Sequence, residues 1–124
     1  GFVLCSNHRS LLAPVFIAVG IKNRKLNFMA KQELFKLKIL DKFFRSVGAF
    51  PVNRGKGDNG AIATAEKILN DNKVLAIFPE GTRSKSGNPL PAKSGVVRIA
   101  HHTKSDILPV GITFEKNLTL FKNF

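Results

Sequence analysis

Short apolar runs alternate with amphipathic segments along this chain. Five runs rich in β-branched and aromatic residues predict strands at Phe2–Cys5, Leu26–Met29, Ala49–Val52, Val74–Phe78 and Ile107–Phe114. The segments between them carry apolar residues at spacings of three and four, and they predict helices at Leu11–Val19, Lys31–Val47, Asn59–Leu69 and Lys93–His101. This alternation predicts an α/β fold with a mixed, mostly parallel sheet flanked by helices.

Length and cysteine content limit the number of domains and the kinds of cross-link that the chain can have. The 124 residues fit one domain, spanning residues 1–124. The chain opens on one apolar run and stops soon after another, so we expect a core domain that lacks N- and C-terminal parts. The single Cys5 excludes an internal disulfide. Acids and histidines do not cluster at ligand spacings, so we expect no metal.

The formal charge of +12 favours a polyanionic partner, which could be nucleic acid, an anionic membrane surface or a phosphorylated substrate. Lys22–Arg45 holds eight Lys or Arg against Glu33 and Asp41, a net +6, interleaved with Leu, Ile and Phe. This pattern favours contact with an anionic membrane surface over an ordinary amphipathic helix on the sheet. A basic nucleic-acid-binding module is the rival, but zinc-ligand and helix-turn-helix patterns are absent from the sequence, so no nucleic acid is expected.

Three polar loops follow predicted strands, where ligands of α/β sheets bind. His8 follows the first strand and is a candidate general base, although a lone loop histidine often has no role. Arg54 follows the third strand and could hold a phosphate through two parallel hydrogen bonds, or be a solvated charge. Glu80 and Arg83 follow the fourth strand, and a structural ion pair is the competing interpretation.

Four short blocks occur in a fixed order, at Asn7–Ala13, Gly48–Arg54, Phe78–Ser84 and Leu108–Ile112. In this order the chain resembles the lysophosphatidic acid acyltransferase family, whose blocks read N-H-x4-D, G-x5-R, F-P-E-G-T-R-S and an apolar P-V-G strand. The third block matches at every position, and the resemblance covers essentially the whole chain.

The resemblance implies a role for each block. His8 would be the general base that takes a proton from a glycerol hydroxyl as it attacks an acyl thioester, without an acyl-enzyme. The second and third blocks would bind the acceptor through Arg54, Glu80, Gly81, Thr82 and Arg83. Pro109 and Gly111 of the fourth block would lie on the acyl-donor side.

The resemblance also implies the substrates. The acceptor is expected to be lysophosphatidic acid (1-acylglycerol 3-phosphate) rather than glycerol 3-phosphate, and the product phosphatidic acid. Acyl-CoA or an acyl-carrier-protein thioester would serve as co-substrate, with no bound cofactor. The expected location is the cytoplasmic face of a membrane, as a peripheral or anchored protein.

One position departs from the family pattern. The first block ends in Asp in the family (the HX4D motif) and in Ala13 here. In a His–carboxylate pair the acid fixes the tautomer and stabilises the imidazolium, and disabling it in the serine-protease template costs about 10⁴ in kcat. We therefore expect strongly reduced turnover with ligand binding retained. The alternative is a non-catalytic lysophospholipid- or membrane-binding domain.

Overall fold

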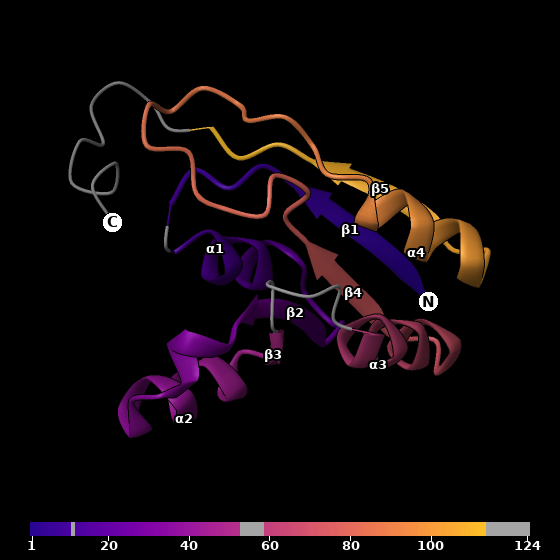
Figure 1. The fold of residues 1–124 in the computed structure, drawn as a ribbon, viewed down its shortest axis with the longest axis horizontal. Coiled ribbons are helices and arrows are strands. Elements are labelled where there is room, and N and C mark those ends of the chain that lie inside the picture. The colour runs from indigo at the N-terminus through magenta and orange to yellow at the C-terminus, as the bar shows by residue number, and fades with distance from the viewer. Residues whose placement is uncertain (11, 53–58, 114–124) are drawn as a thin grey trace.

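A computed structural model describes residues 1–10, 12–52 and 59–113 of the chain (Figure 1). The described elements follow in the order β1 (Phe2–Ser6), α1 (Ala13–Gly20), β2 (Leu26–Lys31), the 3-10 helix η1 (Gln32–Phe35), α2 (Lys38–Ser46), β3 (Ala49–Val52), α3 (Asn59–Asn70), β4 (Val74–Ile77), α4 (Gly95–Thr103) and β5 (Asp106–Val110). The strands form one sheet in the order β3-β2-β4-β1-β5. The predicted α/β fold is confirmed, and every described strand pairing is parallel.

The sheet carries an apolar core on each face, because successive residues of a strand point to opposite sides. Val3 of β1 and Leu75 of β4 pack in a cluster with α3 and α4, which contact one another. Leu4 of β1 packs in a second cluster with Ile17 of α1. Both β1 residues are fully buried. Parallel sheets are typically covered in this way by helices on both faces.

The predicted helix at Lys31–Val47 is wrong as a single element. Lys31 is the last residue of β2 and pairs with Val52 of β3, so the sheet holds it extended. The one-turn η1 follows, and the chain is extended again at Leu37 (φ −91°, ψ 122°) before α2 begins. Pairing with β3 therefore overrides the helical spacing at the start of this segment. Figure 1 shows α2 at the periphery of the fold.

The remaining predicted elements are confirmed to within a few residues. The last strand is shorter than expected, since β5 ends at Val110 and the predicted end, Phe114, lies outside the described residues. Among the described residues the longest helix is α3, with 12 residues, and none is long and apolar enough to cross a bilayer.

A glycine fixes the junction between α2 and β3. Gly48 has φ +86°, a conformation that side chains with a Cβ rarely adopt. A Cβ at this position would lie 2.0 Å from the carbonyl oxygen of Leu26. The Gly48 N–H donates to the carbonyl of Arg45 at the end of α2, and its own carbonyl accepts from Phe28 of β2. This glycine, the first residue of the second block, lets the chain leave α2 and enter the sheet at once.

Candidate active site

His8 is held through its backbone by the loop that follows β4. Its N–H donates to Oε1 of Glu80 at 2.9 Å, and its carbonyl accepts from the Ser84 N–H at 3.0 Å. The two contacts come from opposite ends of the Glu80–Ser84 segment. The third block therefore fixes the position of the histidine of the first block.

The imidazole of His8 is held as well. It stacks on the ring of Phe78, with centroids 4.3 Å apart and planes inclined by 23°. Its Nδ1 is buried. Phe78, Glu80 and Ser84 thus restrain both the ring and the backbone of His8, which is the preorganisation that a catalytic side chain requires.

Glu80 is buried, with 6% of its surface exposed. Its second oxygen, Oε2, accepts from the Leu90 N–H at 2.8 Å, so both carboxylate oxygens receive a backbone N–H. The chain reverses around it through the Gly81 N–H, which donates to the Phe78 carbonyl at 3.0 Å, with Gly81 at φ +73°. The structure thus places Glu80 in contact with the backbones of His8 and Leu90.

His8 opens on a cavity of about 270 Å³ on the α1 and α2 side of the sheet. The structure brings four predicted site residues together in its lining: His8, Gly81, Thr82 and Arg83. Lys31 and Lys85 add two cations, and apolar side chains form the rest, among them Phe28, Met29, Leu34 and Phe44. The cavity therefore combines an imidazole and a cationic group with an apolar wall, a combination suited to an amphiphile that carries a phosphate.

The other predicted site residues lie elsewhere. Ala13 is fully buried at the start of α1, where its N–H donates to the Ser10 carbonyl at 3.1 Å, and its neighbour Pro14 lines the cavity. Pro109 and Gly111 line neither described cavity. Arg54 lies outside the described residues.

Asn7 joins the fourth block to the first. Its Nδ2 donates to the Ile112 carbonyl at 3.0 Å, and its Oδ1 accepts from the Ile112 N–H at 2.7 Å. A side-chain amide matches a peptide group in just this way, because each offers one donor and one acceptor. The residue next to His8 thus fixes the chain that leaves β5.

Two cations of the cavity, Lys31 and Lys85, are not among the site residues predicted from sequence. A signal exists for both, since Lys31 ends a strand of a parallel sheet and Lys85 directly follows the third block, and ligands bind at the carboxyl ends of such strands. The helical spacing of Lys31–Val47 instead predicts Lys31 within a helix.

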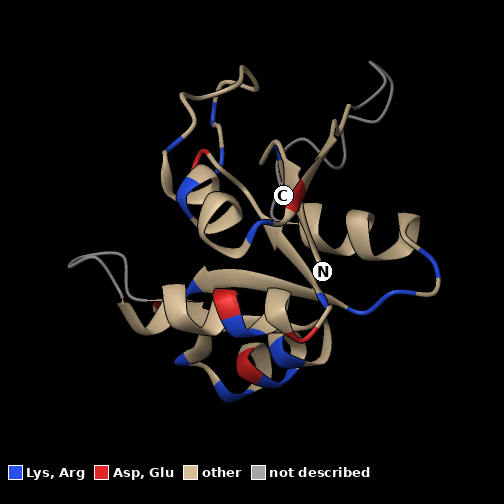
Figure 2. Cartoon of the chain, turned by 90° about the vertical axis from the view of Figure 1, so that its right-hand side faces the viewer, with Lys and Arg blue, Asp and Glu red and all other residues tan. Residues whose placement is uncertain are grey.

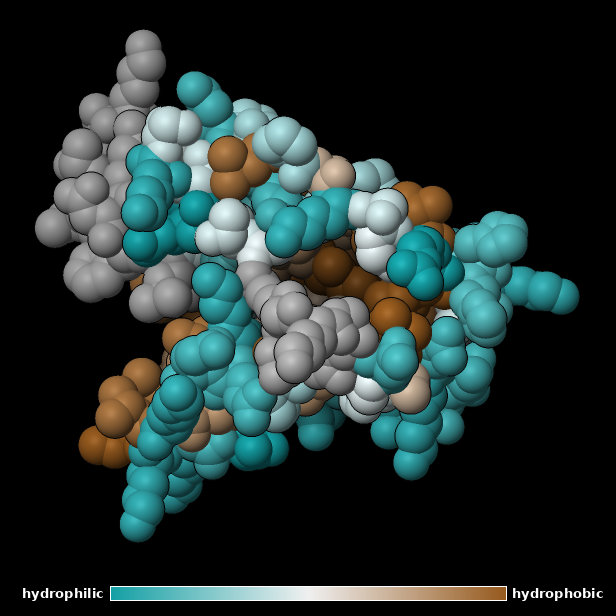
Figure 3. All heavy atoms as spheres, viewed as in Figure 1, coloured by the Kyte–Doolittle hydropathy of each residue, from teal (hydrophilic) through white to brown (hydrophobic). Residues whose placement is uncertain are grey.

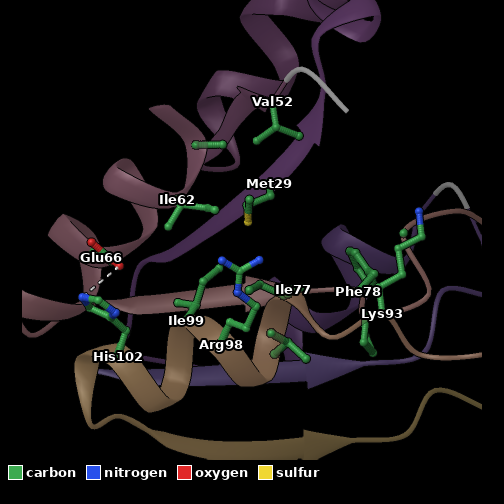
Figure 4. A pocket seen from close by; sticks show the side chains of 15 residues that line it. Met29, Val52, Ile62, Glu66, Ile77, Phe78, Lys93, Arg98, Ile99 and His102 are labelled. Carbon is green, nitrogen blue, oxygen red and sulfur yellow. Dashed lines mark ion pairs between the residues drawn. The ribbon is translucent and has the colours of Figure 1, made fainter. Parts of the chain in front are cut away.

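A second cavity, of about 330 Å³, lies on the opposite face between α3 and α4. Figure 4 shows Met29 of β2, Ile62 of α3 and Arg98 of α4 pointing into it. His102 and Glu66 form an ion pair at 3.9 Å at one side. Met29, Phe78 and Gly81 line both cavities.

Cys5 lies half-buried on β1, and burial raises the pKa of its thiol. A raised pKa keeps the thiol protonated at neutral pH and disfavours nucleophilic attack by it. Over the described residues, no three of the His, Cys, Asp and Glu side chains gather where they could hold a metal ion.

The described residues thus combine a five-stranded parallel sheet with a restrained histidine beside a cationic, apolar cavity. The family model described as Acyltransferase matches residues 1–113, and the chain belongs to this family.

Relatives within the family are similar over most of this chain. The 1-acyl-sn-glycerol-3-phosphate acyltransferase of Bacillus subtilis is 36% identical over 109 residues, which cover 88% of this chain and 54% of the relative. The enzyme of the same name from Streptococcus pneumoniae is 34% identical over 113 residues, covering 90% of this chain and 41% of the relative. The chain thus spans about half the length of the curated relatives it matches.

A solved structure is also similar. The crystal structure of the 1-acyl-sn-glycerophosphate (LPA) acyltransferase PlsC from Thermotoga maritima superposes with a TM-score of 0.69 at 28% sequence identity. The match covers 88% of this chain and 43% of that one. The predicted family is therefore confirmed by sequence and by fold.

Proposed function

We propose that this chain is the catalytic core of an enzyme that transfers a fatty acyl group from an acyl thioester to the free hydroxyl of lysophosphatidic acid, giving phosphatidic acid. One observation carries the proposal: the third block holds His8 on the wall of a cavity that also presents Arg83 and an apolar lining. The names of the relatives support the acceptor.

In the proposed reaction His8 is the general base. Its Nδ1 is buried, which leaves Nε2 to accept the proton of the glycerol hydroxyl. The hydroxyl oxygen attacks the thioester carbonyl and forms a tetrahedral intermediate. Its collapse breaks the carbon–sulfur bond, and the imidazolium returns the proton to the departing thiolate. The products are phosphatidic acid and a free thiol, and no acyl-enzyme forms.

The acceptor phosphate is assigned to the cationic part of the cavity. Arg83 offers two parallel hydrogen bonds to phosphate oxygens, and Lys31 and Lys85 supply further positive charge. The apolar lining suits the acyl chain of a lysophospholipid. The net charge of +12 favours an anionic partner. In this proposal that partner is an anionic lipid at the cytoplasmic face of a membrane, and not a nucleic acid.

We expect Ala13 to limit the chemical step. Ala13 offers no carboxylate that could fix the tautomer of His8 or stabilise its imidazolium. An acid is electrostatically favourable here, because position 13 begins α1 and the first turn of α1 contains no acidic residue.

The test is an Ala13→Asp assay with lysophosphatidic acid, using acyl-CoA and acyl-carrier-protein thioesters in parallel. We expect kcat to rise by about 10³–10⁴ with little change in KM, by analogy with the serine-protease template. Ala13→Asn is the matched control, since it adds the same bulk without a charge. If Ala13→Asp shows no more turnover than Ala13→Asp combined with His8→Ala, the proposal is wrong.

A second candidate function is lysophospholipid binding without turnover, and Ala13 is the observation that favours it. Both candidates predict that the unaltered chain binds lysophosphatidic acid. Calorimetry should show binding about tenfold weaker or more in Arg83→Gln than in Lys67→Gln, a surface control on α3. Turnover gained through Ala13→Asp would contradict the second candidate, because the site would then contain the remaining groups for catalysis.

A further inference from the structure

The helix α2 leaves most of its apolar side outside the core. None of its residues is buried. Ile39 is 85% exposed and Phe43 45%, and the preceding Leu37 is 64% exposed. Ile39 is the most exposed large hydrophobic residue in the described part of the chain. Such a group of apolar side chains marks an interaction surface, because single exposed residues are normal but clusters are not.

The position of each residue around α2 explains this exposure. At 100° per residue, Phe44, Leu40, Phe43 and Ile39 form one continuous apolar stripe. Phe44, at one edge of the stripe, packs against the core beside Phe35, with ring centroids 6.0 Å apart. The other edge, at Ile39, faces outward. The fold therefore uses only one edge of the stripe.

Positive charge surrounds the outward edge. Lys36, Lys38 and Lys42 are exposed. Asp41, the only acid in α2, forms an ion pair with Arg45 at 2.7 Å, so its charge is neutralised within the helix. Figure 2 shows Lys and Arg, with fewer acids, at the lower end of the molecule. Figure 3 shows hydrophobic side chains protruding at the lower left, where Figure 1 places α2.

The same segment forms part of the wall of the His8 cavity. Leu34, Phe44 and Val47 line that cavity, as does Lys31 at the end of β2. The outward edge of α2 and the cavity are thus two sides of one segment. A surface that bound the outward edge would therefore lie next to the wall of the His8 cavity.

We propose that α2 docks on an anionic phospholipid bilayer through the α2 patch, which consists of Lys36, Leu37, Lys38, Ile39, Lys42 and Phe43. The three apolar side chains enter the interface between headgroups and acyl chains, and the three ammonium groups contact anionic headgroups. The His8 cavity then opens at the level of the headgroups, where a lysophospholipid resides. The reason for docking rests on the proposed function. Membrane binding is measured without turnover, however, so the docking proposal and the proposed function can each fail independently.

The first test measures sedimentation of the unaltered chain with vesicles of equal parts phosphatidylglycerol and phosphatidylcholine, and with pure phosphatidylcholine. We expect binding to the anionic vesicles that weakens with salt. The charge variant combines Lys36→Gln, Lys38→Gln and Lys42→Gln, and the matched control with equal net charge combines Lys25→Gln, Lys67→Gln and Lys104→Gln. The charge variant should bind about 100-fold more weakly, and the control much less so. Equal losses in both would overturn the proposal, because net charge alone would then explain binding.

The second test locates the inserted side chain. The chain contains no Trp, so Phe43→Trp gives a single fluorescent probe, and Val97→Trp on the exposed surface of α4 is its control. On anionic vesicles the emission of Phe43→Trp should shift to the blue and be quenched by brominated lipids, while that of Val97→Trp should not. The proposal is overturned if the emission of Phe43→Trp does not shift on anionic vesicles. It is also overturned if the emission shifts to the blue without lipid and increasingly so with protein concentration, because a second copy of the chain would then cover the α2 patch.

Discussion

At the scale of single residues, the described contacts of the third block hold His8 in place. The stacked ring of Phe78, the carboxylate of Glu80 and the N–H of Ser84 each restrain the histidine. Sequence resemblance assigned Glu80 to acceptor binding, and that assignment stays a prediction. Its two hydrogen bonds to backbone N–H groups point to a positioning residue, which acts on the reaction through His8.

Replacing Glu80 distinguishes these roles. In the Ala13→Asp protein, Glu80→Gln loses the charge and turns an N–H donor toward one of the two backbone N–H groups. A positioning role predicts that kcat falls roughly 10–100-fold, because small displacements of a catalytic group are costly, while KM for lysophosphatidic acid changes little. Steady-state kinetics measures both. Glu66→Gln on α3 is the control with the same charge change, and a raised KM at unchanged kcat would instead support acceptor binding.

Cys5 provides a test of burial. Because burial raises its pKa, the folded state holds the thiol proton more tightly than the unfolded state does. The resulting contribution to the free energy of unfolding is fully present below the unfolded pKa of ~8.5. It is lost as the pH rises through the folded pKa. Iodoacetamide alkylation followed across pH should show a higher midpoint in native protein than in urea. A lower native midpoint would mark a reactive thiolate and contradict the burial argument.

At the scale of elements, Gly48 explains a motif position that sequence reasoning treated only as spacing. Its left-handed backbone, one residue after the Val47 C-cap of α2, turns the chain directly into β3. Because the carbonyl of Leu26 occupies the space of a side chain, no rotamer can relieve the contact. The second block thus begins with a structural requirement of the fold.

Gly48→Ala should lower the free energy of unfolding by about 2 kcal/mol or more, from backbone strain and the clash with the carbonyl of Leu26. Gly95→Ala, at the first position of α4 with open space around it, should be neutral or slightly stabilising. Urea denaturation of both proteins checks this. Equal stabilities would show that the junction adapts freely to a side chain.

The strands were predictable from the sequence, whereas one helix boundary was not. Apolar runs predicted all five strands of the described sheet. The run is continuous in the central strand β4, because a parallel strand covered by helices on both faces is apolar along its length. The extended backbone of Lys31 could not be predicted, since it depends on the pairing of Lys31 with Val52, a contact between separate segments. The same limit hid Lys31 from the candidate site.

At the scale of the whole molecule, the alternation of strands and helices predicted that the polar loops after the strands lie at the carboxyl edge of the sheet, where ligands bind. The structure places His8 and Arg83 in the lining of one cavity. The detailed contacts were beyond sequence reasoning. The bonds of Glu80 to His8 and Leu90 depend on the exact path of a loop, which composition does not determine.

The two cores should contribute independently to stability. Ile17 of α1 and Ile99 of α4 are buried on opposite faces of the sheet. Ile17→Val and Ile99→Val should each cost about 1 kcal/mol, and the double variant should equal their sum within about 0.5 kcal/mol. Chemical denaturation measures all three proteins. A larger coupling energy would show that the sheet transmits repacking from one face to the other.

The position of β1 has a consequence for synthesis on the ribosome. β1 pairs only with β4 and β5 among the described strands, and its nearest partner in sequence begins at Val74. At about 5–20 residues per second, the first strand waits roughly 4–14 s for that partner to be translated. The hydrogen bond between His8 and Glu80, 72 positions apart, has the same delay. The nascent chain therefore exposes β1 until β4 has been translated, and the backbone of His8 gains its two loop contacts only after Glu80 and Ser84 follow.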